Sequence, residues 1–418
     1  MWVEIKGWVY KKRTHKDIIF LDVRNTSGIT QCVVIKNNVS KDLWEAASKL
    51  TQESSLIIYG DKKEEQRAPG GYEIVVKKID PVNVALSPYP LAKKEHSPEY
   101  LMEKRHLTLR SPRYQAIMKV RQGIMKAFRD YFTENNWFEI SPPIITNSAV
   151  EGGATLFEID YFGQKAYLTQ SWQLYAEAIL PSLEKIFTIA PSFRAEKSRT
   201  RRHLCEFYHA EAEAAWIGLK DLFKIEEEVI ENICSYVSEK YKKELEVLGR
   251  DPSSIAKIKG PFKKISYSEA LQILKDKGRP ISYGEDLGAD EERVLTQDLS
   301  EPVFVHSYPL EIKAFYVKED PSNPGIGLTT DLLAPEGYGE ITTGGEREDN
   351  LDKLVKRLQS QNLDVKNYEW YLDLRRYGSV PHAGFGLGID RMTMWLCKLD
   401  HIRDAIPFPR LARSSYYI

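Results

Sequence analysis

Residues 192–213, SFRAEKSRTRRHLCEFYHAEAE, join a strongly charged loop to an alternating apolar and polar segment. Residues 194–203 contain five Lys or Arg and one Glu. We expect a strand that ends at Arg194, a loop, and a returning strand on which Glu211 and Glu213 share one face, because side chains two apart point the same way. An arginine at a strand end can clamp a phosphate through two hydrogen bonds. The segment therefore predicts either a polyanion site or a solvated hairpin of ion pairs.

Two segments further along the chain offer related chemistry. Residues 384–391, GFGLGIDR, read as a glycine-rich strand end that opens a helix, where a ligand can approach the backbone near Arg391. Asp331 and Glu340 would lie on neighbouring strands, where two carboxylates can hold Mg²⁺ against nucleotide phosphates. Gly344-Gly345 brings backbone close to a small substrate, and Arg347 would anchor it. A plain helix entry and a surface turn are the structural alternatives.

Residues 113–418 predict an α+β domain. Extended structure is expected over 137–146, around Pro142 and Pro143. The order of the strand and helix patterns along this part of the chain indicates an antiparallel sheet flanked by helices. The chain has neither G-x-x-x-x-G-K-[ST] nor a strand-borne G-x-G-x-x-G with a downstream acid, which disfavours the two commonest nucleotide folds. Helical patterns cover 114–135, 171–183, 220–241, 268–277, 349–361 and 391–399, and strand patterns cover 165–169, 302–307 and 311–317.

Residues 1–84 predict a small β-barrel. The helical pattern follows the third strand, which is the order of an oligonucleotide-binding (OB) barrel; any other small barrel is the alternative. Five prolines fall within 81–112, so 85–112 reads as a hinge between domains 1–84 and 113–418. Strand patterns cover 2–10, 18–23, 30–34, 55–59 and 72–78, a hairpin signal covers 25–28, and a helical pattern covers 40–50.

Composition narrows the class of protein. The 418 residues suit two or three domains, and a net charge of −1 excludes a globally basic nucleic-acid binder, although residues 1–80 carry 14 Lys or Arg against 11 Asp or Glu. No apolar run is long enough for a membrane span, and the first residues lack a secretory pattern. The four cysteines are scattered, which disfavours a disulfide scaffold or a zinc site. We expect a cytoplasmic protein.

The three segments, in this order, resemble the three-motif signature of class II aminoacyl-tRNA synthetases. The resemblance implies that Arg194 binds the ATP α-phosphate, that Arg391 binds the γ-phosphate, and that both are catalytic together with Glu340. It implies Mg²⁺ at Asp331 and Glu340. Pro143 resembles the first motif, which builds a homodimer interface in that family. The implied ATP-binding residues are Arg194, Glu196, Arg202, His203, Leu204, Phe207, Glu340, Gly388 and Arg391, with adenine stacked on Phe207.

The leading barrel resembles that of the subclass for Asp, Asn and Lys, where it reads the anticodon. Phe20 and Gln31 match positions that stack on and hydrogen-bond the central anticodon uridine. Aspartyl enzymes read Q-S-P-Q-x-x-K where residues 170–176 read QSWQLYA, so Ala176 replaces the lysine that binds the substrate carboxylate. Losing that cation disfavours aspartate. The chain resembles asparaginyl-tRNA synthetases of archaeal and eukaryotic type, which residues 194–203, 368–381 and 401–404 also match.

That resemblance implies an ATP-dependent ligase that activates L-asparagine and charges tRNA(Asn). Glu177 would accept from the substrate amide and Arg347 would hold its oxygen. Two other hypotheses stay open: an aspartate-accepting enzyme of the same fold, and a non-catalytic tRNA-binding paralogue. The implied amino-acid-binding residues are Glu151, Ser171, Gln173, Glu177, Glu211 and Arg347, with Glu151 and Glu211 near the substrate ammonium.

Overall fold

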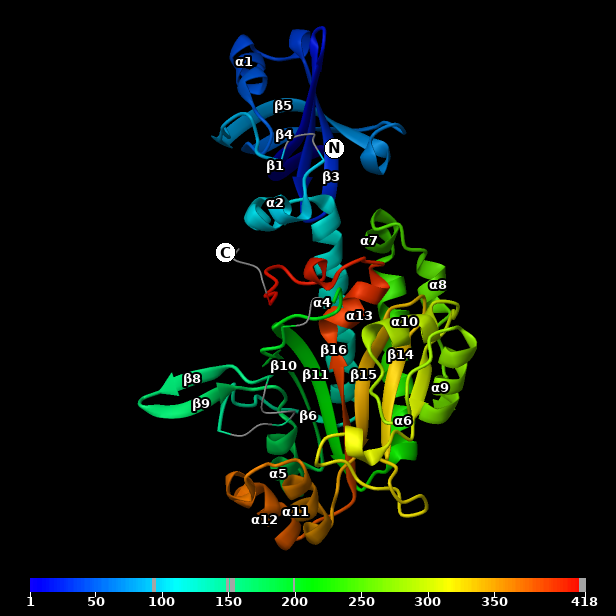
Figure 1. The fold of residues 1–418 in the computed structure, drawn as a ribbon. Helices are drawn as coiled ribbons and strands as arrows, with labels where there is room; N and C mark the ends of the chain where they lie inside the picture. The colour runs from blue at the N-terminus through cyan, green and yellow to red at the C-terminus, as the bar shows by residue number, and fades with distance from the viewer. Residues whose placement is uncertain (92–94, 148–149, 151–154, 198–199, 413–418) are drawn as a thin grey trace. The chain divides into compact units, whose positions relative to one another are not determined.

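The computed structural model describes residues 1–91, 95–147, 150, 155–197 and 200–412 (Figure 1). The chain divides into two compact units, Met1–Gln115 and Ala116–Ile418. No helix in the described residues is both long and apolar enough to span a membrane.

The first unit contains a closed five-stranded barrel with strand order β1-β2-β3-β5-β4. Helix α1 (Lys41–Lys49) follows the third strand, and its N-terminus is capped because Ser40 Oγ accepts from the Leu43 amide at 3.2 Å. This confirms the predicted barrel and its helix. The strands are β1 (Trp2–His15), β2 (Ile18–Asn25), β3 (Gly28–Ile35), β4 (Ser55–Glu64) and β5 (Tyr72–Asn83).

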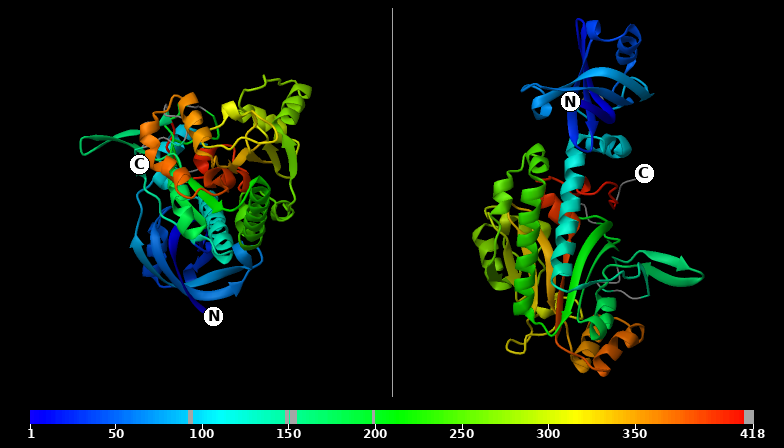
Figure 2. Two further views of the ribbon diagram at one scale, coloured as in Figure 1. Left: turned by 90° about the horizontal axis from the view of Figure 1, so that it is seen from below. Right: turned by 180° about the vertical axis from the view of Figure 1, so that it is seen from behind.

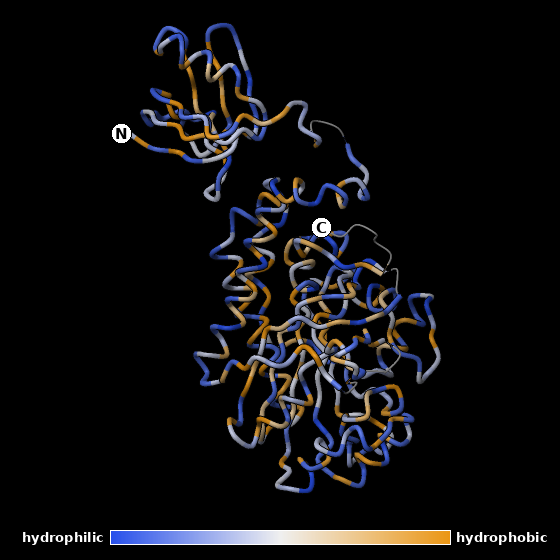
Figure 3. Tube along the Cα trace, turned by 90° about the vertical axis from the view of Figure 1, so that its left-hand side faces the viewer, coloured by the Kyte–Doolittle hydropathy of each residue, from blue (hydrophilic) through white to orange (hydrophobic). Residues whose placement is uncertain are grey.

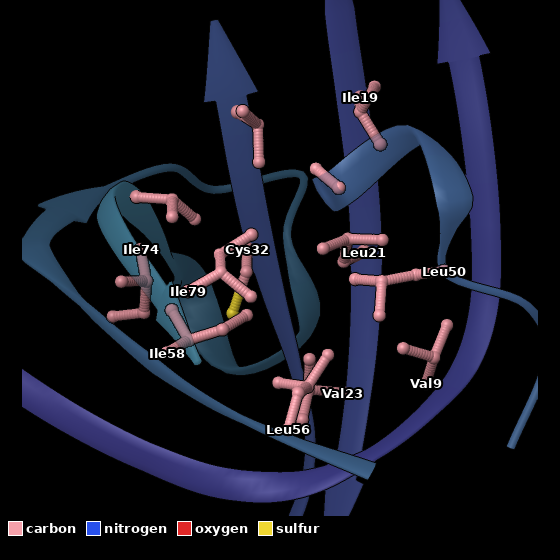
Figure 4. Close-up of a cluster of buried hydrophobic side chains, with 13 residues drawn as sticks. Val9, Ile19, Leu21, Val23, Cys32, Leu50, Leu56, Ile58, Ile74 and Ile79 are labelled. Carbon is pink, nitrogen blue, oxygen red and sulfur yellow. The ribbon is translucent and has the colours of Figure 1, made fainter. Parts of the chain in front are cut away.

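Alternating side chains build the barrel interior. Ile19, Leu21 and Val23 of β2 are buried and point into a core that also holds Cys32 and Ile58 (Figure 4). Figure 3 shows hydrophobic residues along the strands and hydrophilic residues at the turns. The period of two therefore places the intervening residues of β2 on the outside of the barrel.

Two short helices lie where the sequence indicated no regular element. Helix α2 (Pro98–Glu103) begins at Ser97, whose Oγ accepts from the Tyr100 amide at 3.2 Å, and α3 (Arg105–Thr108) follows it. Proline is tolerated in the first turn of a helix, so Pro98 starts α2 instead of preventing it.

The second unit is built on an eight-stranded sheet with order β12-β13-β14-β15-β16-β11-β10-β6. Its central strands are antiparallel, whereas the edge strands β6 and β12 run parallel to their neighbours. This confirms the predicted α+β layer. The strands are β6 (Phe138–Glu139), β10 (Lys185–Phe193), β11 (Glu206–Ala215), β12 (Lys263–Ser266), β13 (Val303–His306), β14 (Thr329–Ala334), β15 (Gly339–Glu346) and β16 (His382–Gly388).

Helices cover one face of this sheet. Figure 2 (right) shows α4 (Pro112–Glu134) and α6 (Leu219–Lys240) running along that face. A separate three-stranded sheet comprises β7 (Ile145–Thr146), β8 (Glu158–Tyr161) and β9 (Gln164–Leu168). The other helices are α5 (Gln173–Leu183), α7 (Lys242–Val247), α8 (Pro252–Ala256), α9 (Tyr267–Asp276), α10 (Ala289–Thr296), α11 (Leu351–Ser360), α12 (Glu369–Arg376) and α13 (Ile389–Leu396).

One predicted strand is wrong. Residues 311–317 begin in a 3-10 turn (Leu310–Ile312) and continue without a ladder, apart from one bridge between Val317 and Arg347. The consecutive residues Phe315, Tyr316 and Val317 are all buried, in a cluster with α11 and α12. Apolar packing, and not strand pairing, accounts for the pattern.

Candidate active site

A cavity of about 440 Å³ lies in the second unit and is lined from β11, β14, β15, β16 and α13 and from the segment that follows β10. This volume falls in the ordinary range for small-molecule sites. Most of the site residues predicted for this unit line it, namely Ser171, Gln173, Arg194, Glu196, Arg202, His203, Leu204, Phe207, Glu211, Asp331, Glu340, Arg347, Gly388 and Arg391. Glu177 does not line the cavity, and Glu151 lies outside the described residues.

One end of the cavity, the cationic end, gathers Arg194, Arg202, Arg391 and Lys313. Arg391 lies in the first turn of α13 and donates to Glu340 Oε1 at 2.5 Å. The Arg194 guanidinium lies 5.5 Å from the centre of the Phe207 ring. Burial opposes ionisation of Glu340, but Arg391, Arg202 and Arg194 together lower its pKa. This concentration of positive charge suits a polyphosphate.

Glu292 of α10 organises part of the cationic end. Its Oε2 accepts from Arg202 Nη1 at 2.5 Å and from the Glu340 amide at 2.6 Å. Arg202 Nη2 also donates to the Glu340 carbonyl at 3.0 Å. A side chain at Gly339, where φ is +70°, would collide with Arg202 and Glu292. Glu292 was not predicted as a site residue, because it lies 90 residues from Arg202 and carries no motif of its own.

Two histidines at this end are neutral at physiological pH. Burial, and then the charge of Arg391, lower the pKa of His203 to about 4. Burial, and then Arg194 and Arg391, lower that of His209 to about 3. The positive charge here is therefore carried by arginine and lysine alone.

The opposite end, the pocket end, contains a buried ion pair. Arg347 Nε and Nη2 donate to the two carboxylate oxygens of Glu213, each at 2.9 Å. Burial raises the pKa of Glu213, and the charge of Arg347 partly offsets that effect. Glu213 lines the cavity but was not among the predicted site residues, although the sequence placed it on the same strand face as Glu211.

The glycine-rich strand β16 makes room for this pair. A Cβ at Gly384 would lie 1.9 Å from Glu213 Oε2, and one at Gly386 would lie 2.9 Å from His209 Nε2. Register pairs Gly384 with Glu213 and Gly386 with Glu211 across β11 and β16. The glycines therefore let charged side chains lie flat on the sheet floor.

Ser171, Gln173 and Glu211 form a second polar group at the pocket end. Ser171 Oγ donates to Glu211 Oε1 and accepts from the backbone amide of Gln173 at 3.2 Å. The Trp172 amide also donates to Glu211, at 3.3 Å. Glu211 thus presents an oriented carboxylate to the cavity.

The expectation that Glu177 accepts directly from a substrate amide is wrong. Its side chain is 1% exposed and lies behind Gln173, where both oxygens are already occupied by protein donors. The helical spacing of α5 puts residue 177 one turn below residue 173, on the buried side.

The carboxylates of Asp331 and Glu340 fit Mg²⁺. Both line the cavity from adjacent strands, and Mg²⁺ takes one or two carboxylates together with substrate phosphates. Asp331 accepts from Thr343 Oγ1 and pairs with Lys313 Nζ at 3.2 Å, whereas Glu340 pairs with Arg391. Each oxygen donor therefore has a protein cation that a bound metal would replace.

The predicted anticodon residues lie on the outer face of the barrel in the first unit. Arg13 Nη2 donates to Asp22 Oδ1 at 3.0 Å and to Gln31 Oε1 at 3.1 Å, and Arg13 lies over the Phe20 ring at 5.5 Å. Gln31 Nε2 donates to Glu73 Oε2 at 3.1 Å. An aromatic face beside a hydrogen-bonding network suits an unpaired base.

Comparison with known proteins matches both units. The family described as tRNA synthetases class II (D, K and N) matches residues 97–412, and an OB-fold nucleic acid binding domain matches residues 3–82. The chain therefore belongs to the class II tRNA synthetases of the D, K and N group.

Close relatives narrow the family further. The asparagine–tRNA ligase of Pyrococcus abyssi is 51% identical over 99% of this chain and 96% of its own length. The crystal structure of asparaginyl-tRNA synthetase from Pyrococcus horikoshii complexed with asparaginyl-adenylate matches with TM-score 0.96 and 50% identity, covering 99% of this chain and 96% of that one. The Entamoeba histolytica asparaginyl-tRNA synthetase matches with TM-score 0.91 and 34% identity, covering 98% and 95%. Within the class, the chain belongs to the asparagine–tRNA ligases.

Proposed function

We propose that this chain activates L-asparagine with ATP and transfers it to the 3′ end of tRNA(Asn). An asparagine α-carboxylate oxygen attacks the α-phosphorus of ATP, and the bond to the bridging oxygen breaks to release pyrophosphate. A terminal ribose hydroxyl of the tRNA then attacks the carbonyl carbon and loses its proton, and AMP leaves. Both steps depend mainly on positioning and on stabilisation of charge.

The observation that carries this proposal is the Arg347–Glu213 pair at the pocket end. A carboxamide has one acceptor oxygen and an NH₂ group with two donors. Arg347 donates and Glu213 accepts, so the pair complements a carboxamide. Aspartate would place a second carboxylate against Glu213, which is destabilising in a buried site. The proposal therefore assigns the preference for asparagine to this pair.

The cationic end binds the triphosphate. Arg194 is assigned to the α-phosphate and Arg391 to the γ-phosphate, and exchange of the Glu340 contact for a phosphate frees the guanidinium of Arg391. Phe207, already in contact with Arg194, stacks on adenine. The remaining ATP-binding assignments are Glu196, Arg202, His203, Leu204 and Gly388, all of which line the cavity.

Mg²⁺ would be held by Asp331 and Glu340, where it would neutralise phosphate charge. Ser171, Gln173 and Glu211 surround the amino-acid backbone, and Glu211 attracts its ammonium group. In the barrel, Phe20 stacks on a base of the anticodon and Gln31 hydrogen-bonds the same base. Through these contacts the barrel binds the tRNA.

We further propose a homodimer formed through the first-motif region. A hollow is lined by Pro142, Pro143, Tyr175 and Trp370 together with Ile144 and Ile145, which are 41% and 44% exposed. A second copy would cover these apolar side chains.

The proposal keeps the functional division into 1–84, hinge 85–112 and 113–418. It also keeps a cytoplasmic location, on the ground of the scattered cysteines.

ATP–pyrophosphate exchange with each of the twenty amino acids tests the proposal, followed by charging of deacylated total tRNA. We expect exchange with asparagine and charging of one tRNA fraction. Exchange with aspartate at a comparable rate would overturn the assignment of the Arg347–Glu213 pair. Failure of every amino acid to support exchange would favour a non-catalytic tRNA-binding protein.

A further inference from the structure

Glu177 lies at the centre of a buried cluster behind the pocket end. Its carboxylate accepts from Tyr371 Oη at 2.7 and 2.8 Å and from Arg375 Nη2 at 2.6 Å. His382 Nε2 lies 3.0 Å away. Burial opposes ionisation, but Arg375 and then His382 outweigh it and lower the pKa of Glu177. Glu177 is therefore an ionised group that can only accept hydrogen bonds.

This charge state determines how the amide of Gln173 is turned. Gln173 Nε2 lies 3.1 Å from Glu177 Oε1 and must be the donor, because a carboxylate has no proton to give. Gln173 lines the cavity and Glu177 does not, so the amide nitrogen faces away from the cavity and the amide oxygen faces it. Within the described part of the chain, Gln173 Oε1 accepts no hydrogen bond.

We propose that Glu177 is a positioning residue that orients the Gln173 amide so that its oxygen accepts a hydrogen bond from the ammonium group of the amino-acid substrate. The neighbours of Gln173 support the ammonium as the partner. The Gln173 backbone amide donates to Ser171 Oγ, which in turn donates to the carboxylate of Glu211. An ammonium beside Glu211 thus lies near Gln173 as well. The reversed amide would direct NH₂ protons at a cation.

The inference rests on the proposed function, because it assumes that an amino acid occupies the pocket end. It goes further by identifying how a residue with no contact to the substrate acts on binding. It also explains why the cluster includes Tyr371 and Arg375, one turn apart on α12: they keep Glu177 charged and fixed.

The main test is the Glu177→Gln variant of the full chain, assayed by pyrophosphate exchange. A glutamine at 177 can donate as well as accept, so the Gln173 amide loses its fixed orientation. We expect KM for asparagine to rise ~10-fold to 100-fold, as for loss of a hydrogen bond to a charged group. KM for ATP should change less than about twofold, since the cationic end is untouched.

A probe without the ammonium separates this role from general damage to the pocket. Succinamic acid is asparagine without its α-ammonium, and its inhibition constant against asparagine can be measured in the same exchange assay. Glu177→Gln should leave that constant within about twofold, because the probe offers nothing to Gln173 Oε1. Equal weakening of asparagine and succinamic acid would overturn the proposal, as would no change in KM for asparagine.

Two further variants provide matched controls. Tyr371→Phe removes one donor but keeps the Glu177 carboxylate, so KM for asparagine should rise only about two- to threefold. Glu369→Gln alters an exposed ion pair with Arg376 on the same helix and should leave both KM values unchanged. A Tyr371→Phe effect as large as that of Glu177→Gln would mean that the cluster has only a structural role.

Should Glu177→Gln fail to fold, two substitutions at residue 173 decide the question. Gln173→Glu keeps an acceptor toward the cavity and shares one proton with Glu177, so KM for asparagine should stay within about threefold. Gln173→Met removes the acceptor and should raise KM about tenfold or more. Equal effects would overturn the proposal. Wild-type exchange with asparagine is the common reference, so its absence would refute the proposed function and not this inference alone.

Discussion

The two ends of the cavity both hold an Arg–Glu pair, but they differ in burial. At the cationic end, Arg391 and Glu340 are 19% and 30% exposed, and one 2.5 Å contact joins the guanidinium to the carboxylate. At the pocket end, Arg347 and Glu213 are 6% and 2% exposed and form two parallel contacts. The first pair can exchange partners with a phosphate and a metal ion, whereas the second is a fixed template.

The difference indicates what each pair is for. A buried ion pair recovers its desolvation cost only with good geometry, so it is weak evidence for stability. At the pocket end the close approach of Gly384 leaves Glu213 room for that geometry. We infer that burial there gives specificity, while partial exposure at the cationic end allows ligand exchange.

The largest expected effect on activity is at the Arg391–Glu340 pair. Arg391→Ala removes the group assigned to the γ-phosphate, and we expect pyrophosphate exchange to fall by ~10³-fold or more. Circular dichroism and size-exclusion chromatography should still report a folded protein, because Arg391 is part of no hydrophobic core. Near-normal exchange would show that the cationic end is not the triphosphate site.

The second-largest expected effect on activity is at the Arg347–Glu213 pair. Glu213→Gln leaves Arg347 without a compensating charge in a buried site, and we expect kcat/KM for asparagine to fall by ~10²-fold. Removal of the negative charge should also reduce discrimination against aspartate. Exchange rates with the two amino acids at saturating ATP measure both effects. An unchanged ratio of asparagine to aspartate would contradict the template role.

A smaller effect is expected in the first unit, on the barrel. Phe20→Ala removes a stacking surface that contributes ~1–3 kcal/mol per base, so KM for tRNA should rise about fivefold or more. Pyrophosphate exchange does not need tRNA and should be unchanged. Equal loss in both assays would indicate a folding defect.

The smallest expected effect is a pH dependence of the free energy of unfolding that comes from the cationic end. Burial, followed by Arg194 and Arg391, lowers the pKa of His209 to about 3, against ~6.5 in an unfolded chain. Between these values the unfolded state binds a proton that the folded state does not. The free energy of unfolding therefore falls as pH drops from 6.5, by up to ~1.4 kcal/mol per pH unit for this group.

His209→Gln should flatten that slope. Urea denaturation at intervals between pH 7 and 4.5 measures it, with His15→Gln, an exposed position on β1, as the control. An identical slope in His209→Gln and the wild-type protein would show that His209 does not carry the acid sensitivity.

Much of the architecture could be predicted from local pattern. Alternation in β2 and the turn at 25–28 defined the barrel, and the charged loop between β10 and β11 marked the cationic end. The failed strand at 311–317 has an apolar run that suits a strand, but these side chains pack against α11 and α12. A local pattern of apolar residues indicates which side chains are buried, but it does not indicate which helices or strands pack against them.

By itself, the sequence determined the two-unit organisation and the arginines and carboxylates that line the cavity, and the resemblance of its motifs to a known family implied the synthetase class. These features depend on residue type and short spacing, which are visible along the chain. Only the tertiary structure decided the partners of those residues: Glu213 with Arg347, Glu292 with Arg202, and Glu177 behind Gln173 instead of in the pocket. Such pairings join residues from distant segments, and burial decides which of several nearby carboxylates faces the ligand.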